Sequence, residues 1–155
     1  MNRLRAILPI LLVLVMTLVT ACGGNVAQEP PTYTPEKITE IQQVLKPVKQ
    51  VRERMPELKE YIDEKDWNDV DSFIHGPLGG IRQSLGYVNR TLLEDDQPPA
   101  KETAERLFKD LERIDSAADA EVYADAVRYY NRAVEDLDQY LDLIPTEPTD
   151  SETSA

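Results

Sequence analysis

Apolar residues recur at spacings of three and four positions along most of the chain from residue 34 to residue 144. This periodicity predicts amphipathic helices, and no stretch shows the two-residue alternation of a half-buried strand. In the first segment the apolar positions are Ile38, Ile41, Leu45, Val48, Met55, Leu58 and Ile62. Pro47 and Pro56 fall inside it, and we expect the helix to bend or break there because proline lacks an amide donor and crowds the preceding turn.

Three more helical segments follow the first. After Asp66 the apolar pattern is interrupted at residues 75–77 and then resumes. The loop over residues 94–99 ends in two prolines and leads into the next helix. The segment 100–144 contains no glycine or proline, but the sequence Ser-Ala-Ala-Asp at 116–119 resembles a capping box. It predicts that a new helix starts there.

Four amphipathic helices joined by short connections favour an all-α fold, an antiparallel up-down-up-down four-helix bundle over residues 34–145. A three-helix bundle with one long hairpin is the alternative. We expect the isolated domain to be a monomer, because its apolar stripes can cover one another within one chain. Charged residues, 30% of the chain, then lie on the outer faces in pairs such as Arg132 with Asp136. Residues 146–155 are predicted to be a disordered polar tail.

The first 22 residues have the pattern of an export signal. Two arginines precede an apolar stretch over residues 6–19, whose length suits the apolar core of a secretory signal, about 7–15 residues, better than a spanning helix of about 17–25. Small residues lead into the only cysteine, Cys22, and two glycines follow it, as in a bacterial lipobox. We expect a signal peptide over 1–21, an acyl lipid such as palmitate on Cys22 and a flexible linker over 22–33. An uncleaved membrane anchor is the alternative.

Composition narrows the function classes. The chain has 17 basic and 29 acidic residues and a formal net charge of −12, which argues against a nucleic-acid partner because such binding needs a basic face. One cysteine and one histidine rule out a zinc finger, a haem attachment motif and a dithiol redox pair. The pairs Asp95–Asp96 and Asp136–Asp138 are expected to be solvated charges rather than catalytic dyads. We therefore expect a protein that is not an enzyme and has no intrinsic cofactor.

His75 is the one histidine that a metal site could use. Asp71 lies four residues earlier, so a helix would place both side chains on one face, where they could hold a peripheral Zn²⁺ or Ca²⁺. Two ligands make a weak site, and a surface histidine beside a helix end is the alternative. Trp67, Phe73, His75 and Arg82 are candidates for a partner interface. For the two aromatic residues, packing in the core is the favoured interpretation and an interface anchor is the alternative.

The stretch from Trp67 to Arg82, WNDVDSFIHGPLGGIR, resembles the PsbQ family of photosystem II extrinsic proteins. The likeness continues through shorter matches within residues 92–118 and 130–145, and it covers most of the chain that follows the predicted linker. The lipobox is typical of the cyanobacterial form of the family.

This resemblance implies a four-helix, up-down-up-down subunit on the lumenal side of the cyanobacterial thylakoid membrane, attached to photosystem II and held there by the lipid on Cys22. Members of the family stabilise the manganese–calcium oxygen-evolving complex and help to retain calcium and chloride without binding the cluster themselves. The implied partners are the PsbO subunit and the core antenna. The alternative hypothesis is a periplasmic helical lipoprotein that carries a metal or a small ligand in its bundle.

Overall fold

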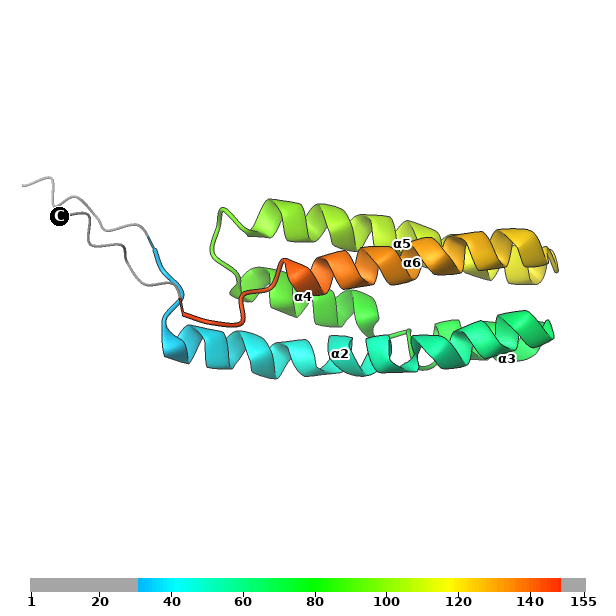
Figure 1. Ribbon diagram of the computed structural model, residues 1–155, viewed down its shortest axis with the longest axis horizontal. Helices are drawn as coiled ribbons and strands as arrows, with labels where there is room; N and C mark the ends of the chain where they lie inside the picture. Colours follow the sequence, from blue (N-terminus) through cyan, green and yellow to red (C-terminus); the bar gives the residue numbers. More distant parts are fainter. Residues whose placement is uncertain (1–30, 149–155) are drawn as a thin grey trace, which may run out of the picture. The chain divides into compact units, whose positions relative to one another are not determined.

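The computed structural model describes residues 31–148. The predicted signal peptide, Cys22 and most of the predicted linker and tail lie outside this range. Within it the chain forms five helices and no strand (Figure 1), which confirms the all-helical prediction for the described residues. The helices are α2 (Pro35–Glu64), α3 (Trp67–His75), α4 (Ile81–Thr91), α5 (Gln97–Asp119) and α6 (Tyr123–Asp142).

Helix α2 runs without interruption through both of its prolines, so the break expected at Pro47 or Pro56 does not occur. Both prolines are exposed, and the carbonyl groups that lose their amide partners can bond water instead. The helix begins after Thr34, whose hydroxyl accepts the amide N–H of Lys37 at 3.2 Å. It ends at Glu64, and the next residue, Lys65, turns the chain with a left-handed φ of 58°.

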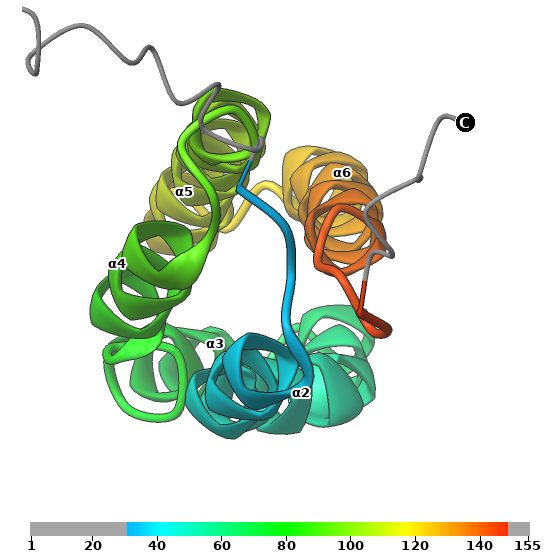
Figure 2. The ribbon, with the colours of Figure 1, turned by 90° about the vertical axis from the view of Figure 1, so that its left-hand side faces the viewer.

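Helices α3 and α4 occupy the part of the chain predicted to form the second helix of the bundle. Asp66 caps α3 by accepting the amide N–H of Asp69. The helix ends at His75, where the sequence predicts an interruption, and α4 begins at Ile81. Both helices pack between α2 and α5, one after the other along the domain (Figures 1 and 2).

Helices α5 and α6 form the most extensive helix pair in the described domain. The predicted division of the segment 100–144 into two helices is confirmed, but it lies after the predicted position, because α5 continues to Asp119 and α6 begins at Tyr123. Ser116 does not cap a new helix; its hydroxyl donates to the carbonyl of Glu112, one turn back, at 2.9 Å. The turn is made by Glu121 with a left-handed φ of 53°. A residue in this conformation is usually glycine. Because glutamate takes its place here, the sequence does not mark the position of the turn.

The apolar stripes of all five helices meet in one core. The largest fully buried side chains of the described range are Ile41, Leu45, Val48, Met55, Leu58, Ile62, Val70, Leu85, Leu107, Ile114, Leu137 and Tyr140. Tyr140 of α6 also donates its hydroxyl to Oδ1 of Asn89 on α4 at 2.7 Å, and burial raises its pKa above the ordinary value. Among the helices of the described range, none has the length and apolar character needed to cross a membrane.

Tyr33, the last residue of the predicted linker, is part of the packed domain. Its side chain is buried, and its hydroxyl donates to Oδ2 of Asp96 at 2.6 Å and accepts the amide N–H of Leu93 at 3.1 Å. Burial, followed by the hydrogen bond to Asp96, raises the pKa of Tyr33 from 10.0 to about 12. The folded domain therefore includes at least one residue that the sequence assigns to the linker.

Candidate functional site

The link between α3 and α4 brings the backbone closer to itself than a side chain would allow. A Cβ atom at Gly76 would lie 2.7 Å from a backbone carbonyl oxygen one turn back, and one at Gly79 would lie 2.5 Å from the carbonyl oxygen of His75. Glycine is therefore required at both positions. Phe73 and Leu78 on either side of the first glycine are buried in the core. As a result His75 is held at the exposed end of α3.

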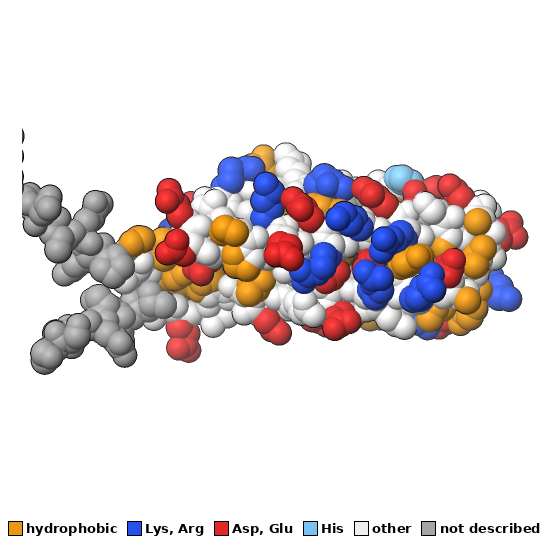
Figure 3. Space-filling view, turned by 90° about the horizontal axis from the view of Figure 1, so that it is seen from above, with side chains coloured by type: hydrophobic (Ala, Val, Ile, Leu, Met, Phe, Trp, Pro, Cys, Tyr) orange, Lys and Arg blue, Asp and Glu red, His pale blue; other side chains and the backbone are white. Residues whose placement is uncertain are grey.

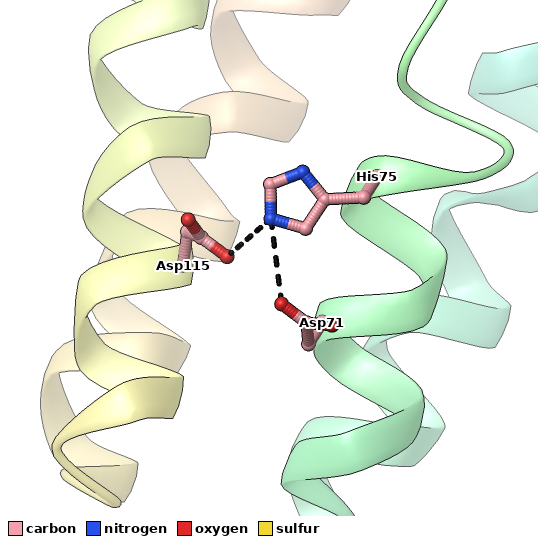
Figure 4. Close-up of side chains that lie close together, drawn as sticks. All are labelled: Asp71, His75 and Asp115. Atoms are coloured by element: carbon pink, nitrogen blue, oxygen red, sulfur yellow. Dashed lines mark ion pairs between the residues drawn. The ribbon is translucent and has the colours of Figure 1, made fainter.

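His75 lies beside two carboxylates, one from its own helix and one from α5 (Figure 4). Its Nε2 atom is 3.3 Å from Oδ1 of Asp71 and 3.4 Å from Oδ1 of Asp115. One ligand atom from each of the three residues falls within 4.8 Å of the others. The side chains of His75 and Asp71 are more than half exposed, and that of Asp115 is 30% exposed, so the cluster opens to solvent.

Asp115 is the member of this cluster that sequence reasoning missed. Asp71 and His75 are four residues apart on one helix, so their proximity follows from helical geometry alone. Asp115 is 40 residues further along the chain than His75 and reaches the cluster only because α3 packs against α5. The one available signal was its place inside a segment that carries the family resemblance.

The cluster offers two kinds of interaction. When His75 is neutral, the Nε2 lone pair and two carboxylate oxygens can bind a divalent cation, and this nitrogen and oxygen set suits Zn²⁺. When His75 is protonated, its imidazolium pairs with Asp71 and Asp115 and links α3 to α5. Exposed ion pairs of this kind contribute only about 0.2–1 kcal/mol to stability, so the fold depends little on this contact.

Arg82 on α4 lies next to the cluster and contacts α5. Its guanidinium carbon is 4.0 Å from the ring centroid of Phe108, and its Nη2 atom donates to Oε1 of Glu112 at 3.1 Å. With His75 and Asp115, these residues line a cleft of about 220 Å³. A larger groove of about 700 Å³ continues from Arg82 along α4 and α5. The predicted interface residues His75 and Arg82 are thus neighbours on one side of the domain.

The two aromatic interface candidates lie deeper. Phe73 is 3% exposed; its ring makes an edge contact with Tyr61 at 6.2 Å between centroids and lies under Arg54 at 5.1 Å. Trp67 is partly buried and packs against the core. Both residues therefore contribute to packing, and a contact of either with a partner stays a prediction.

Two carboxylates between α5 and α6 are buried. Asp136 is 7% exposed and accepts Nε–H of Arg106 at 2.9 Å. Asp110 is fully buried, with Nη1 of Arg113 at 3.0 Å from Oδ1 and Nε of Arg132 at 3.0 Å from Oδ2. The second contact is an ion pair without hydrogen-bond geometry. The expected solvation of Asp136 and its pairing with Arg132 are therefore wrong, because Arg132 turns to the buried Asp110 instead.

The acidic pairs singled out in the sequence do not form dyads. Asp138 faces α2, where it accepts Nη2–H of Arg52 at 2.9 Å, and this hydrogen bond raises the pKa of Arg52. Asp136 faces α5 instead. Asp96 accepts the hydroxyl of Tyr33, whereas Asp95 is exposed. The two members of each pair therefore have different surroundings.

Comparison with known proteins decides the family. The model of the PsbQ family, described as Oxygen evolving enhancer protein 3, matches residues 2–145. The chain belongs to the PsbQ family. It is also similar to CyanoQ of Synechocystis sp. (strain ATCC 27184 / PCC 6803 / Kazusa), with 38% identity over 146 residues, which cover 94% of this chain and 98% of that protein.

In this PsbQ-family chain the residues that carry the resemblance fall into two groups. Phe73 and Leu107 are buried in the core, so they are needed for the fold. His75, Arg82 and Asp115 reach solvent on one side of the domain. A partner or an ion can reach only the second group, which makes it the candidate functional site.

Proposed function

We propose that this protein is a non-catalytic extrinsic subunit of photosystem II on the lumenal side of the thylakoid membrane, where it stabilises the oxygen-evolving complex. The observation that carries the proposal is the likeness to CyanoQ, which extends over 94% of this chain and 98% of that protein. A likeness of this extent includes the helical domain together with the segment before it. The description of the family model, Oxygen evolving enhancer protein 3, supports the same function.

A helical subunit can support oxygen evolution without chemistry of its own. By binding the assembled complex and not its separated parts, it shifts the equilibrium toward assembly. By covering the lumenal surface, it slows the loss of calcium and chloride and so supports their retention. The buried carboxylates Asp110 and Asp136, which are the groups that a catalytic acid would need, are paired with arginines. This pairing supports a structural role for both.

The proposed scaffold is an up-down-up-down four-helix bundle in which α3 and α4 together take one of the four positions. The proposed anchor is a lipid on Cys22, joined by a linker to the domain, which already includes the packed Tyr33. The ten residues between them would reach about 17 Å if flexible, at about 5–6 Å times the square root of their number. The bundle can then contact only partners close to the membrane surface, for which we propose PsbO and the core antenna.

The function is tested by comparing membranes of a deletion strain with those of the parent. We expect oxygen evolution to fall without being abolished, and the loss to be largest after calcium or chloride depletion. Complementation with Cys22→Ser should leave less protein on the membrane after a high-salt wash, because the thioether needs the sulfur. Identical rates and identical ion dependence in both strains would contradict the proposal.

A second candidate function is metal binding at the His75 cluster, favoured by the third donor that α5 supplies. One imidazole nitrogen and two carboxylate oxygens leave room for water in the fourth position of a zinc site. Ca²⁺ takes six to eight oxygen ligands, so we expect Zn²⁺ to bind more tightly than Ca²⁺.

Calorimetric titration of the purified protein with Zn²⁺ and with Ca²⁺ tests this candidate. We expect Asp115→Asn to weaken zinc binding by about tenfold or more, a loss of the size seen when a metal site loses a supporting group. Asp119→Asn, on the same helix and exposed, is the matched control and should bind as the parent does. Equal zinc affinity in Asp115→Asn and the parent would show that the cluster is not the binding site.

A further inference from the structure

Basic side chains gather on the face formed by α5 and α6, although the protein as a whole carries a net charge of −12. Figure 3 shows Lys and Arg side chains close together over the middle of this face. We call the set Lys109, Arg113, Arg128, Tyr129 and Arg132 the arginine face. Lys109 and Arg113 come from α5 and the other three residues from α6.

Two of these arginines form ion pairs with the buried Asp110. Arg113 and Arg132 each approach one of its carboxylate oxygens at 3.0 Å. Their side chains are nonetheless 46% and 51% exposed, so the outer edges of both guanidinium groups remain open to solvent. A side chain that is already held in place loses little entropy when a partner binds.

Tyr129 joins two arginines at the centre of the face. Its partly buried ring lies 5.2 Å from the guanidinium carbon of Arg113 and 4.7 Å from that of Arg128. Arg128 also donates to the Tyr129 hydroxyl at 3.0 Å and to Asp125 at 2.8 Å. Tyrosine and arginine are the residue types enriched at the energetic centres of protein interfaces. The arrangement therefore has the composition of a protein-binding surface.

The charge of the face indicates what it binds. The set has four cations, of which its ion-pair partners Asp110 and Asp125 neutralise two, so the formal excess of the set with these partners is 4 − 2 = +2. An acidic surface complements this excess. An anionic membrane would also attract the face, but it would repel the rest of a chain with a net charge of −12. An acidic patch on a protein would contact only the arginine face and not the acidic remainder of the chain. It is therefore a better partner than an anionic membrane.

We propose that the arginine face is the surface by which this protein docks on an acidic patch of a protein partner. The inference rests on the proposed function, since that function makes the partner a lumenal part of photosystem II. It adds the side of the bundle that docks and the chemistry that recognises it.

The test uses photosystem II isolated from the deletion strain and adds back the full protein at increasing salt. Lys109→Gln with Arg128→Gln removes two cations that do not contact Asp110, so the buried pairing is kept. Lys46→Gln with Lys49→Gln on α2 removes two exposed cations elsewhere and is the matched control. We expect the first variant to bind about tenfold more weakly at about 0.1 M salt, with a shallower salt dependence. The control should bind as the parent does.

Three results would count against the proposal in different ways. Equal binding of the arginine-face variant and the parent would remove the docking surface and leave the proposed function intact. Failure of the parent to bind photosystem II would remove the proposed function itself. Parent binding to phosphatidylglycerol vesicles that the arginine-face variant loses would assign the face to lipid instead. Matching melting temperatures of both variants and the parent would show that any loss is not caused by unfolding.

Discussion

The hairpin of α5 and α6 and the corner between α3 and α4 use similar residue types in opposite ways. The hairpin consists of helices of 23 and 20 residues whose carboxylates Asp110 and Asp136 are buried and paired with arginines. The corner consists of helices of 9 and 11 residues joined through glycines, and its carboxylate Asp71 is exposed beside His75. These two carboxylates of the hairpin are buried, whereas the carboxylate of the corner is accessible to solvent.

This difference separates structural charge from binding charge. The charge of a buried carboxylate is compensated while its arginines are present, but a carboxylate that loses them is left without solvent or partner. An exposed histidine and carboxylate contribute little to stability and remain free to bind. The same argument explains how the hairpin can carry the arginine face, because Asp110 holds Arg113 and Arg132 from the inside.

The largest effect is expected where the hairpin loses its buried pairing. Arg113→Met with Arg132→Met would leave the Asp110 carboxylate buried without a cation, which costs about 3–5 kcal/mol of unfolding free energy. Urea denaturation measures the change. Lys109→Gln with Arg128→Gln, on the same face, should change stability by less than about 0.5 kcal/mol. Similar losses in both double variants would show that Asp110 is not the structural centre of the hairpin.

Two buried tyrosines should make the domain sensitive to alkali. Tyr140 of α6 bonds Asn89 of α4, and Tyr33 bonds Asp96 in the loop before α5. Both folded-state pKa values are raised above 10.0, that of Tyr33 to about 12. The unfolded chain therefore loses these protons first, and stability is full below pH 10 and falls as pH rises through about 12.

Denaturation at pH 9 and at pH 11 measures this loss. Each tyrosine should contribute a slope of up to about 1.4 kcal/mol per pH unit above pH 10. In the double variant Tyr33→Phe with Tyr140→Phe the alkaline slope should become shallower, whatever the change at pH 9. An unchanged slope would mean that other groups control alkaline unfolding.

At the corner, one glycine position should be far more sensitive than its neighbour. Gly79→Ala places a Cβ atom 2.5 Å from the carbonyl oxygen of His75, so the backbone must move, at a cost of about 1–3 kcal/mol. Gly80→Ala meets nothing within 4 Å and has an ordinary helical conformation, so it should be neutral or slightly stabilising. Thermal unfolding of both variants measures the difference, and equal stability of the two would contradict the close approach.

The smallest effect on stability is expected at the exposed cluster. His75→Ala removes ion pairs that are open to solvent, so the unfolding free energy should change by less than about 1 kcal/mol. The same denaturation series measures it. A loss as large as that of the hairpin double variant would mean that the corner also depends on its charges for stability, and the contrast between the two regions would fail.

Much of the fold follows from local patterns in the sequence. The apolar stripes predict the buried faces, including Ile41, Leu107 and Leu137, all fully buried, because helical periodicity needs no knowledge of distant residues. The turn at Glu121 could not be predicted, since a non-glycine residue in a left-handed conformation leaves no local signal. The helix break expected at Pro47 does not occur, because the cost of a proline inside a helix depends on whether the carbonyl group that loses its amide partner can bond water.

Only those residues of the candidate site that lie on the same helix were predicted together. Asp71 and His75 share a helix face and were found together, whereas Asp115 and the Asp110–Arg132 pair depend on how α5 packs against its neighbours. Arg132 had a nearby partner in Asp136, but a buried carboxylate on the adjacent helix took precedence. Sequence spacing shows which partners are possible, and packing decides which one is removed from solvent.

The central claim, that this PsbQ-family protein is a subunit of photosystem II, is tested most directly by isolating it with its partners. The full protein, tagged at its C-terminus and expressed in its own organism, would be purified from solubilised membranes and the co-purifying subunits identified. We predict that the core antenna and PsbO are recovered with it. Recovery of the tagged protein without photosystem II subunits, from membranes that contain active photosystem II, would contradict the claim.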